Sequence, residues 1–232
     1  MTLAEELSEY AKNTHQKVWT RRKGQIVPST DDITMGNQAV DLDAVVLYAD
    51  LKDSTGLVDD YSDEFASEIY KNYLYAVSKI IKANGGTITA FDGDRVMAVY
   101  IGDSKNSAAA RTALRIKWAV DNILQPAIQA QYTSNSFKLR QKVGIASSQT
   151  MVSRTGIRGS NDLVWVGNAA NFAAKLAAFD RGYSSYLTEA VYDSLNAASK
   201  YGGDPQQDMW TDLGVVDDFG RIYASSWEWS FS

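Results

Sequence analysis

Apolar residues fall into two kinds of block along the chain: short β-branched runs and longer stretches with helical spacing. The run over residues 42–49 is largely apolar and rich in valine, which predicts a buried central strand. Apolar residues three or four positions apart predict helices over 62–84 and about 105–130. The first of these helices ends where Asn84 is followed by two glycines.

The remaining blocks continue this alternation of strands and helices. The Asp92-Gly93 pair separates two apolar runs and is a strong signal for a β-hairpin. Further strands are predicted over 87–91, 96–101, 138–147, 163–166, 209–213 and 221–229, further helices over 2–20, 167–178 and 188–199, and a turn-rich excursion over 153–160. This order predicts an α/β or α+β sandwich with helices packed on a sheet.

Two terminal segments differ from this pattern. The segment 21–40 is polar and turn-rich, and no repeat or low-complexity linker interrupts the rest of the chain. The simplest division is an N-terminal helix and arm over 1–40 and a single domain over 41–232. The aromatic tail at Trp227, Trp229 and Phe231 indicates a strand edge or an interface.

Composition restricts the chemistry that the chain can perform. The 232 residues include no Cys and a single His, His15, which lies in a polar stretch near the N-terminus. Disulfides, thiolate metal sites and a three-histidine zinc site are therefore excluded, and a cytoplasmic location is expected. The net charge of −5 argues against nucleic-acid binding. No apolar run approaches the roughly 18 residues that a membrane span needs, so no membrane insertion is expected.

Two aspartates stand where catalytic carboxylates would be expected. Asp50 follows the buried run 42–49, and Asp94 lies just past the Asp-Gly turn. Each alone has an ordinary explanation, as a helix N-cap or as turn chemistry. Together, on neighbouring strand ends and without His or Cys, they suit hard divalent cations such as Mg²⁺ or Mn²⁺, which mostly serve phosphate chemistry.

A third candidate is the helix that follows Gly167. Asn171 and Lys175 are four residues apart and so share one face, where they could hold a ribose oxygen and a phosphate; the alternative is an ordinary solvent-exposed face. Arg95 could reach a phosphate or a base edge, although strand alternation turns it away from Asp94. Lys142 is a further possible phosphate partner, with a surface position as the simpler expectation.

These motifs together resemble the class III nucleotidyl cyclases. The matching segments are 46–51 and 91–98, which resemble the two metal motifs, and 142–145 with 166–176, which resemble a strand and the transition-state helix. The resemblance runs from about residue 42 to the C-terminus, with the motifs in the family's order. It implies a ferredoxin-like α/β sandwich that works as a head-to-tail homodimer with its active sites at the interface.

The resemblance also implies roles for individual residues. Asp50, Asp94 and the Leu51 carbonyl would hold two Mn²⁺ or Mg²⁺ ions. Asn171 and Lys175 would reach the site from the other subunit. The ribose 3′-oxygen would attack the α-phosphate in line and release pyrophosphate.

Several positions depart from the family pattern. Lys175 stands where the family usually has Arg, so a point charge replaces a bidentate fork. The two positions that read adenine in adenylate cyclases hold Ala90 and Val164, and Tyr48 stands where Phe is common. The late Lys that contacts the triphosphate has no clear counterpart near 217–220.

These departures favour a smaller base and resemble the pyrimidine cyclases of bacterial Pycsar antiphage defence. That resemblance associates Tyr48 and Arg95 with the nucleotide pocket and implies cyclic UMP or cyclic CMP, made from UTP or CTP to activate a separate effector. UTP is the expected substrate. The alternatives are a cytidylate cyclase, a purine cyclase, and a degenerate cyclase-like module that only dimerises or senses a ligand.

Overall fold

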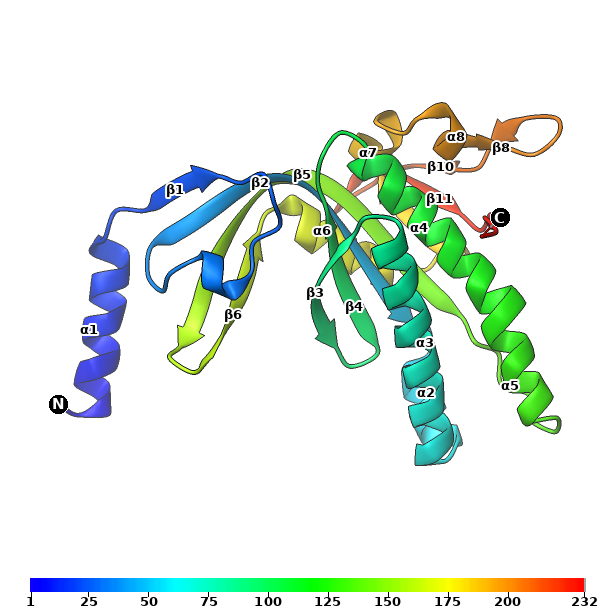
Figure 1. The fold of residues 1–232 in the computed structure, drawn as a ribbon, viewed down its shortest axis with the longest axis horizontal. Coiled ribbons are helices and arrows are strands. Elements are labelled where there is room, and N and C mark those ends of the chain that lie inside the picture. The colour runs from blue at the N-terminus through cyan, green and yellow to red at the C-terminus, as the bar shows by residue number, and fades with distance from the viewer. Residues whose placement is uncertain (232) are drawn as a thin grey trace.

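A long, mainly antiparallel sheet organises the molecule (Figure 1). The structure is a computed structural model that describes residues 1–231. Its nine-stranded sheet has the order β10-β11-β7-β5-β2-β4-β3, with β1 added beside β2 and β6 beside β5. The strands are β1 (Thr20–Lys23), β2 (Gln38–Leu51), β3 (Thr87–Asp92), β4 (Arg95–Tyr100), β5 (Gln141–Ile157), β6 (Ser160–Val166), β7 (Ser185–Thr188), β10 (Thr211–Val216) and β11 (Gly220–Ser225). The two short strands β8 (Tyr201–Gly202) and β9 (Gln207–Asp208) form a separate ribbon.

Helices cover both faces of the central part of this sheet. The helical segments are α1 (Leu3–Gln16), the 3₁₀ turn Thr30–Asp32, α2 (Ser54–Asp60), α3 (Asp63–Ala83), α4 (Lys105–Ala119), the π turn Val120–Leu124, α5 (Gln125–Gln131), α6 (Asn168–Ala178), α7 (Glu189–Asp193) and α8 (Ala197–Lys200). The predicted sandwich class is therefore confirmed. No helix among the described residues is long and apolar enough to cross a membrane.

The β2 strand separates two cores because its side chains point alternately to opposite faces. Val45 and Leu47 join the larger core, beneath α3 and α4, and Val46 joins the smaller core, beneath α6. All three side chains are fully buried. This two-sided burial explains why residues 42–49 lack polar alternation.

The N-terminal part of the chain stands apart from the body, at the other end of an arch (Figure 1). The β1 strand pairs in parallel with the first half of β2, at Thr20–Lys23 against Gln38–Asp41. The side-chain amide of Asn37 donates hydrogen bonds to the carbonyls of Thr14 and Lys17, at 2.8 and 2.7 Å, and so fixes the C-terminal end of α1. No residue of α1 is buried.

The predicted excursion over 153–160 was wrong. The β5 strand continues to Ile157 and pairs with β6 from Met151↔Val166 to Ile157↔Ser160, so only Arg158 and Gly159 turn the chain. This hairpin extends beyond the helices, and little of its outer half is buried. Without a buried face it has no apolar alternation from which a strand could be recognised.

The predicted helix over 188–199 was also wrong. The chain forms two short helices, α7 and α8, because Asn196 starts a new helix by accepting a hydrogen bond from the backbone N–H of Ser199. The strand β7 was missed; it is only four residues long, too short for a period to be measured. The helix α2 was missed as well, and the aromatic tail beyond Ser225 is not a strand.

Candidate functional site

The first candidate carboxylate, Asp50, lies at the end of the buried β2 strand. It is half-buried and stands opposite Lys142 in the register of β2 with β5. The fully buried Tyr73 of α3 donates its hydroxyl to the Asp50 carbonyl at 3.0 Å. Burial, with the nearby charges of Asp50 and Asp94, raises the pKa of Tyr73 well above its ordinary value, so this hydroxyl keeps its proton. The end of the strand is thus fixed in place.

The second carboxylate, Asp94, lies in the tight turn between β3 and β4. Gly93 adopts a φ of 61° in this turn, as the predicted Asp-Gly hairpin requires. Burial, followed by the charge of Asp94, raises the pKa of Asp50 to about 6. The structure therefore brings Asp94 close enough to Asp50 for its charge to disfavour ionisation of Asp50.

The donor set at this position fits a bound cation. The Oδ2 atom of Asp94 is buried and has no hydrogen-bond partner among the described residues. An anionic oxygen buried without a partner is costly, and a divalent cation would relieve both this and the repulsion with Asp50. Among the described residues no group of three or more His, Cys, Asp or Glu side chains gathers for metal binding. A site here would thus rest on two carboxylates completed by backbone or substrate oxygens.

Tyr48 and Arg95 lie next to these carboxylates on one face of the sheet. Tyr48 pairs with Met97 across β2 and β4, so Arg95, two residues before Met97, shares its face. The Arg95 guanidinium carbon lies 6.0 Å from the centre of the Tyr48 ring, and one Nη lies 3.5 Å from Asp92. The buried Arg95 Nε has no partner among the described residues. A hydrogen-bond donor and an aromatic face are thus available beside the carboxylates.

The two positions that would read a purine carry no polar group. Ala90 is half-buried and packs against the same small core as Tyr48. Val164 lies on the β5–β6 hairpin and is 41% exposed. Neither side chain can donate or accept a hydrogen bond to a base.

The helix α6 carries the other two candidates on its exposed face. Its alanine-rich face packs so closely on β5 that a Cβ on Gly144 would lie 2.1 Å from the Ala173 carbonyl oxygen. Asn171 and Lys175 are exposed, and the Lys175 ammonium lies 3.4 Å from the exposed Asp218. Within the described part of the chain, no hydrogen bond or ion pair joins Asn171 or Lys175 to Asp50 or Asp94. The structure therefore shows no direct contact between these two pairs of predicted residues within the described part of the chain.

A cluster of three charges beside Asp50 escaped the sequence analysis. The Asp180 carboxylate receives hydrogen bonds from Lys142 at 2.6 Å and Lys52 at 2.5 Å, and these hold the pKa of Asp180 well below its usual range. Lys142 also donates to the Tyr183 carbonyl at 2.6 Å and is almost fully buried, so the surface position expected for it was wrong. A pocket of about 220 Å³ lies between this cluster and Asp50. The cluster connects the end of β2 with the segment after α6.

Tertiary placement explains why these residues were missed. Lys52 and Asp180 are 128 positions apart, and neither lies in an apolar pattern. Tyr73 lies at an apolar position of the helical spacing in α3, which predicts only a core side chain. The single available signal was the closeness of Lys52 to Asp50, which alone indicates nothing about Asp180.

The amino-acid sequence of the chain is similar to the sequences of known nucleotide cyclases. No protein-family model matches the chain. The chain is 46% identical over 232 residues to a uridylate cyclase of Xanthomonas perforans, with 99% of each chain covered. It is 43% identical over 235 residues to a uridylate cyclase of Burkholderia cepacia, covering 99% of this chain and 100% of that protein.

Solved structures support the same fold. The adenylyl cyclase CyaB from P. aeruginosa aligns with a TM-score of 0.68 at 22% identity, over 80% of this chain and 94% of that one. The guanylyl cyclase Cya2 aligns with a TM-score of 0.66 at 14% identity, over 82% and 95%. The expected class III nucleotidyl cyclase fold is confirmed.

Proposed function

The chain belongs to the uridylate cyclase family, and we propose that it converts UTP to 3′,5′-cyclic UMP and pyrophosphate. In this reaction the ribose 3′-oxygen forms a bond to the α-phosphorus, and the bond from that phosphorus to the bridging oxygen of the β-phosphate breaks. The 3′-hydroxyl proton is released. The observation that carries the proposal is the close pair Asp50 and Asp94, with one buried oxygen unpaired, in a chain so similar to uridylate cyclases over its full length.

Asp50, Asp94 and the Leu51 carbonyl would hold two Mn²⁺ or Mg²⁺ ions. When bound, such ions lower the pKa of an attacking hydroxyl and neutralise charge on the leaving group. The chain itself holds the residues that would bind these ions in fixed positions. Tyr73 anchors the backbone of Asp50, and the tight turn at Gly93 presents Asp94.

Tyr48 and Arg95 are the residues that we assign to the uracil base. The Arg95 Nε, a buried donor without a partner among the described residues, would be satisfied by a carbonyl oxygen of the base. The Tyr48 ring, 6.0 Å from the same guanidinium, offers a face or a hydroxyl. Ala90 and Val164 would leave the amine or carbonyl of a purine unpaired, at a cost of about 1–3 kcal/mol.

Asn171 and Lys175 act, in this proposal, on the site of a second copy of the chain. Their exposure on α6, without a hydrogen bond or ion pair to Asp50 or Asp94 among the described residues, supports a homodimer with composite sites. The Asn171 amide would orient the ribose, and the Lys175 ammonium would balance charge on the transferred phosphoryl group. Its present contact with Asp218 is exposed and weak.

Product identification tests the proposal directly. The purified protein is incubated with ATP, GTP, CTP or UTP and Mn²⁺, and the products are separated chromatographically and identified by mass. Cyclic UMP is expected as the main product. Cyclic CMP alone would transfer the assignment to cytidylate cyclase, and purine products alone, or nucleotide binding without turnover, would contradict it.

Asp94→Asn is expected to abolish turnover in the same assay. Asp43→Asn is the matched control, because Asp43 is exposed, pairs only with Lys105 among the described residues and lies seven residues before Asp50. A fully active Asp94→Asn protein would contradict the metal assignment.

We also propose that cyclic UMP made here activates a separate effector in antiphage defence. The support is the resemblance of the motifs to the Pycsar cyclases. Bacteria that carry the gene for this chain together with its neighbouring genes should resist phage. The same cells with the Asp94→Asn substitution should not. Equal resistance in both strains would separate the enzyme from defence.

A further inference from the structure

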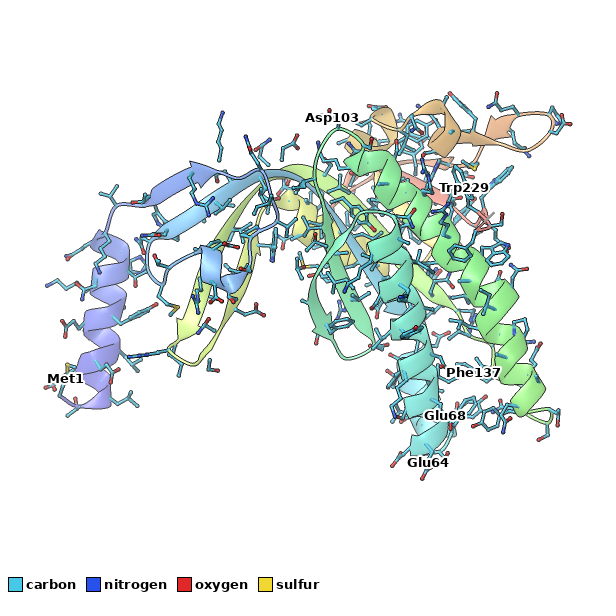
Figure 2. All side chains as sticks on the ribbon, viewed as in Figure 1. Met1, Glu64, Glu68, Asp103, Phe137 and Trp229 are labelled. Carbon is cyan, nitrogen blue, oxygen red and sulfur yellow. The ribbon has the colours of Figure 1, made fainter. Side chains whose placement is uncertain are left out.

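The α1 helix presents an apolar stripe that its own chain does not cover. Leu3, Leu7 and Tyr10 lie on one face at helical spacing and are 70%, 60% and 60% exposed. A capping box between Thr2 and Glu5 starts the helix, and Asn37 holds its end. An isolated helix of 14 residues is only marginally stable in water, even when its ends are capped. Covering its apolar face would therefore stabilise α1 further. Figure 2 shows its side chains, with Met1 at the free end, standing clear of the body.

An apolar groove lies in the other half of the molecule. It has a volume of about 430 Å³ and is bounded by α3, the π turn after α4 and the C-terminal tail. Its most exposed apolar side chains are Tyr75, Ile123 and Phe231. The lining residues are Asn72, Tyr75, Ala76, Lys79, Ile80, Ala83, Ala119, Ile123, Leu124 and Phe231. A groove of this kind between two helices accepts the apolar face of a third helix.

The stripe and the groove cannot meet within one chain. Figure 1 shows α1 at one end of the long axis and α3 in the other half of the molecule, both extending from the same side of the sheet. A two-fold axis between them would place the α1 helix of each copy beside α3 of the other, and both contacts would form at once.

The charges beside the two surfaces are complementary. Glu6 flanks the apolar stripe of α1, whereas Glu5, Glu9 and Lys12 lie on the opposite side of the helix. Lys79 of α3 lines the groove, is exposed and has no ion-pair partner among the described residues. A helix laid with its stripe in this groove would bring Glu6 beside Lys79, and α1 as a whole is acidic, with three Glu against one Lys. The same acidic character disfavours an anionic membrane as the occupant.

We infer that the apolar face of α1 docks in the α3–α4 groove of a second copy of this chain. The groove is lined by none of the residues that the proposed function assigns to the active site. The inference rests on the homodimer in the proposed function, and not on the identity of the nucleotide.

The absence of cysteine allows a clean crosslinking test. Leu7→Cys protein and Ile123→Cys protein are purified separately, mixed without nucleotide and treated with a short bismaleimide. Both positions are exposed, so neither change should disturb folding. The expected result is a product of twice the 25.5 kDa chain mass, formed in the mixture and not by either protein alone.

The matched control replaces Ile123→Cys with Val215→Cys, which is exposed but lies on β10, outside the groove. The inference would be overturned if Leu7→Cys protein crosslinked to Val215→Cys protein as efficiently as to Ile123→Cys protein. It would also be overturned if no crosslink to Ile123→Cys protein formed.

Sedimentation velocity supplies a second measurement on the uncrosslinked full-length chain. Leu7→Glu should raise the dimer dissociation constant at least tenfold, whereas Gln16→Glu, which adds the same charge to the opposite side of α1, should leave it unchanged. Equal constants for wild-type and Leu7→Glu protein would contradict the docking. Neither readout uses catalysis, so a wild-type protein that crosslinks as expected but makes no cyclic UMP would refute only the proposed function.

Discussion

The Asp50 carboxyl ionises less readily in the folded chain than in the unfolded chain. Its pKa rises from 3.8 to about 6, first because of burial and then because of Asp94. Between these two values the folded state binds more protons than the unfolded state, so the stability of the metal-free protein falls as pH rises through this range. At pH 7 the whole of this loss of stability is present, and bound cations would reverse it.

Asp50→Asn should therefore stabilise the metal-free protein while removing its activity. We expect the free energy of unfolding at pH 7 to rise by about 1 kcal/mol, allowing for solvent screening of this half-exposed group, and turnover to fall at least about 100-fold. Urea denaturation at pH 4 and pH 7 measures the first effect. The gain should disappear at pH 4. A variant less stable than wild type at pH 7 would show that Asp50 is not held at a disfavoured charge.

Arg95→Lys separates a recognition role from a catalytic one. Lysine keeps the positive charge near Asp50 but lacks the Nε donor and the planar fork. We expect the KM for UTP to rise about tenfold with kcat within a few-fold of wild type, as for the loss of one hydrogen bond to a charged donor. Steady-state kinetics with UTP distinguish the recognition role from the catalytic role. A large fall in kcat at unchanged KM would place Arg95 in the chemical step instead.

The close contact of α6 with β5 depends on one glycine. A methyl group at position 144 would overlap the Ala173 carbonyl oxygen at 2.1 Å and the Ala177 nitrogen at 2.5 Å, and backbone atoms cannot rotate away. Gly144→Ala should destabilise the fold by about 1–3 kcal/mol and displace Asn171 and Lys175.

Thermal unfolding and kcat measure these two effects of Gly144→Ala. Gly56→Ala is the control, since its Cβ would meet only the Asp60 carboxylate at 3.9 Å. If Gly144→Ala is as stable and as active as Gly56→Ala, the packing of α6 does not position its polar face.

The elements with strong periodicity could be predicted, and those with short or exposed segments could not. The central strand, α3 and the Asp-Gly hairpin each have a buried face or a turn that only certain residues form. Strand β7 has four residues, and the outer half of the β5–β6 hairpin has little buried surface. Their conformation is set by pairing with strands distant in sequence, which no local pattern records.

The residues of the site likewise divide into those that could be predicted from the sequence and those that could not. Asp50 and Asp94 could be chosen because each sits at a recognisable end of a strand, and their neighbours Tyr48 and Arg95 follow from the motifs. The Lys52–Asp180–Lys142 cluster could not, because it exists only once α6 has packed on β5. Sequence motifs therefore located the carboxylates but not the ionic contacts around them.

The whole molecule should need two chains for one active site. Asp50→Asn and Asn171→Ala proteins, each inactive alone, should regain activity when mixed, because a heterodimer has one site with both defects and one with neither. Random exchange makes half of the dimers mixed, so about a quarter of the wild-type rate is expected. Mixing Asp50→Asn with Asp94→Asn is the control and should restore nothing. Failure of the first mixture would indicate that each chain builds its own site.

The ionic contact at Asp180 takes on a different meaning in such a dimer. Lys52 lies in the loop after Asp50 and Leu51, which would hold the metal ions of one active site, while Asp180 lies two residues beyond α6, which would serve the other. A displacement of the loop on substrate binding would thus be transmitted to the neighbouring site, and the rate should depend sigmoidally or biphasically on UTP concentration. Asp180→Asn should return the curve toward a hyperbola. A hyperbolic curve for the wild-type protein would mean that the two sites turn over independently.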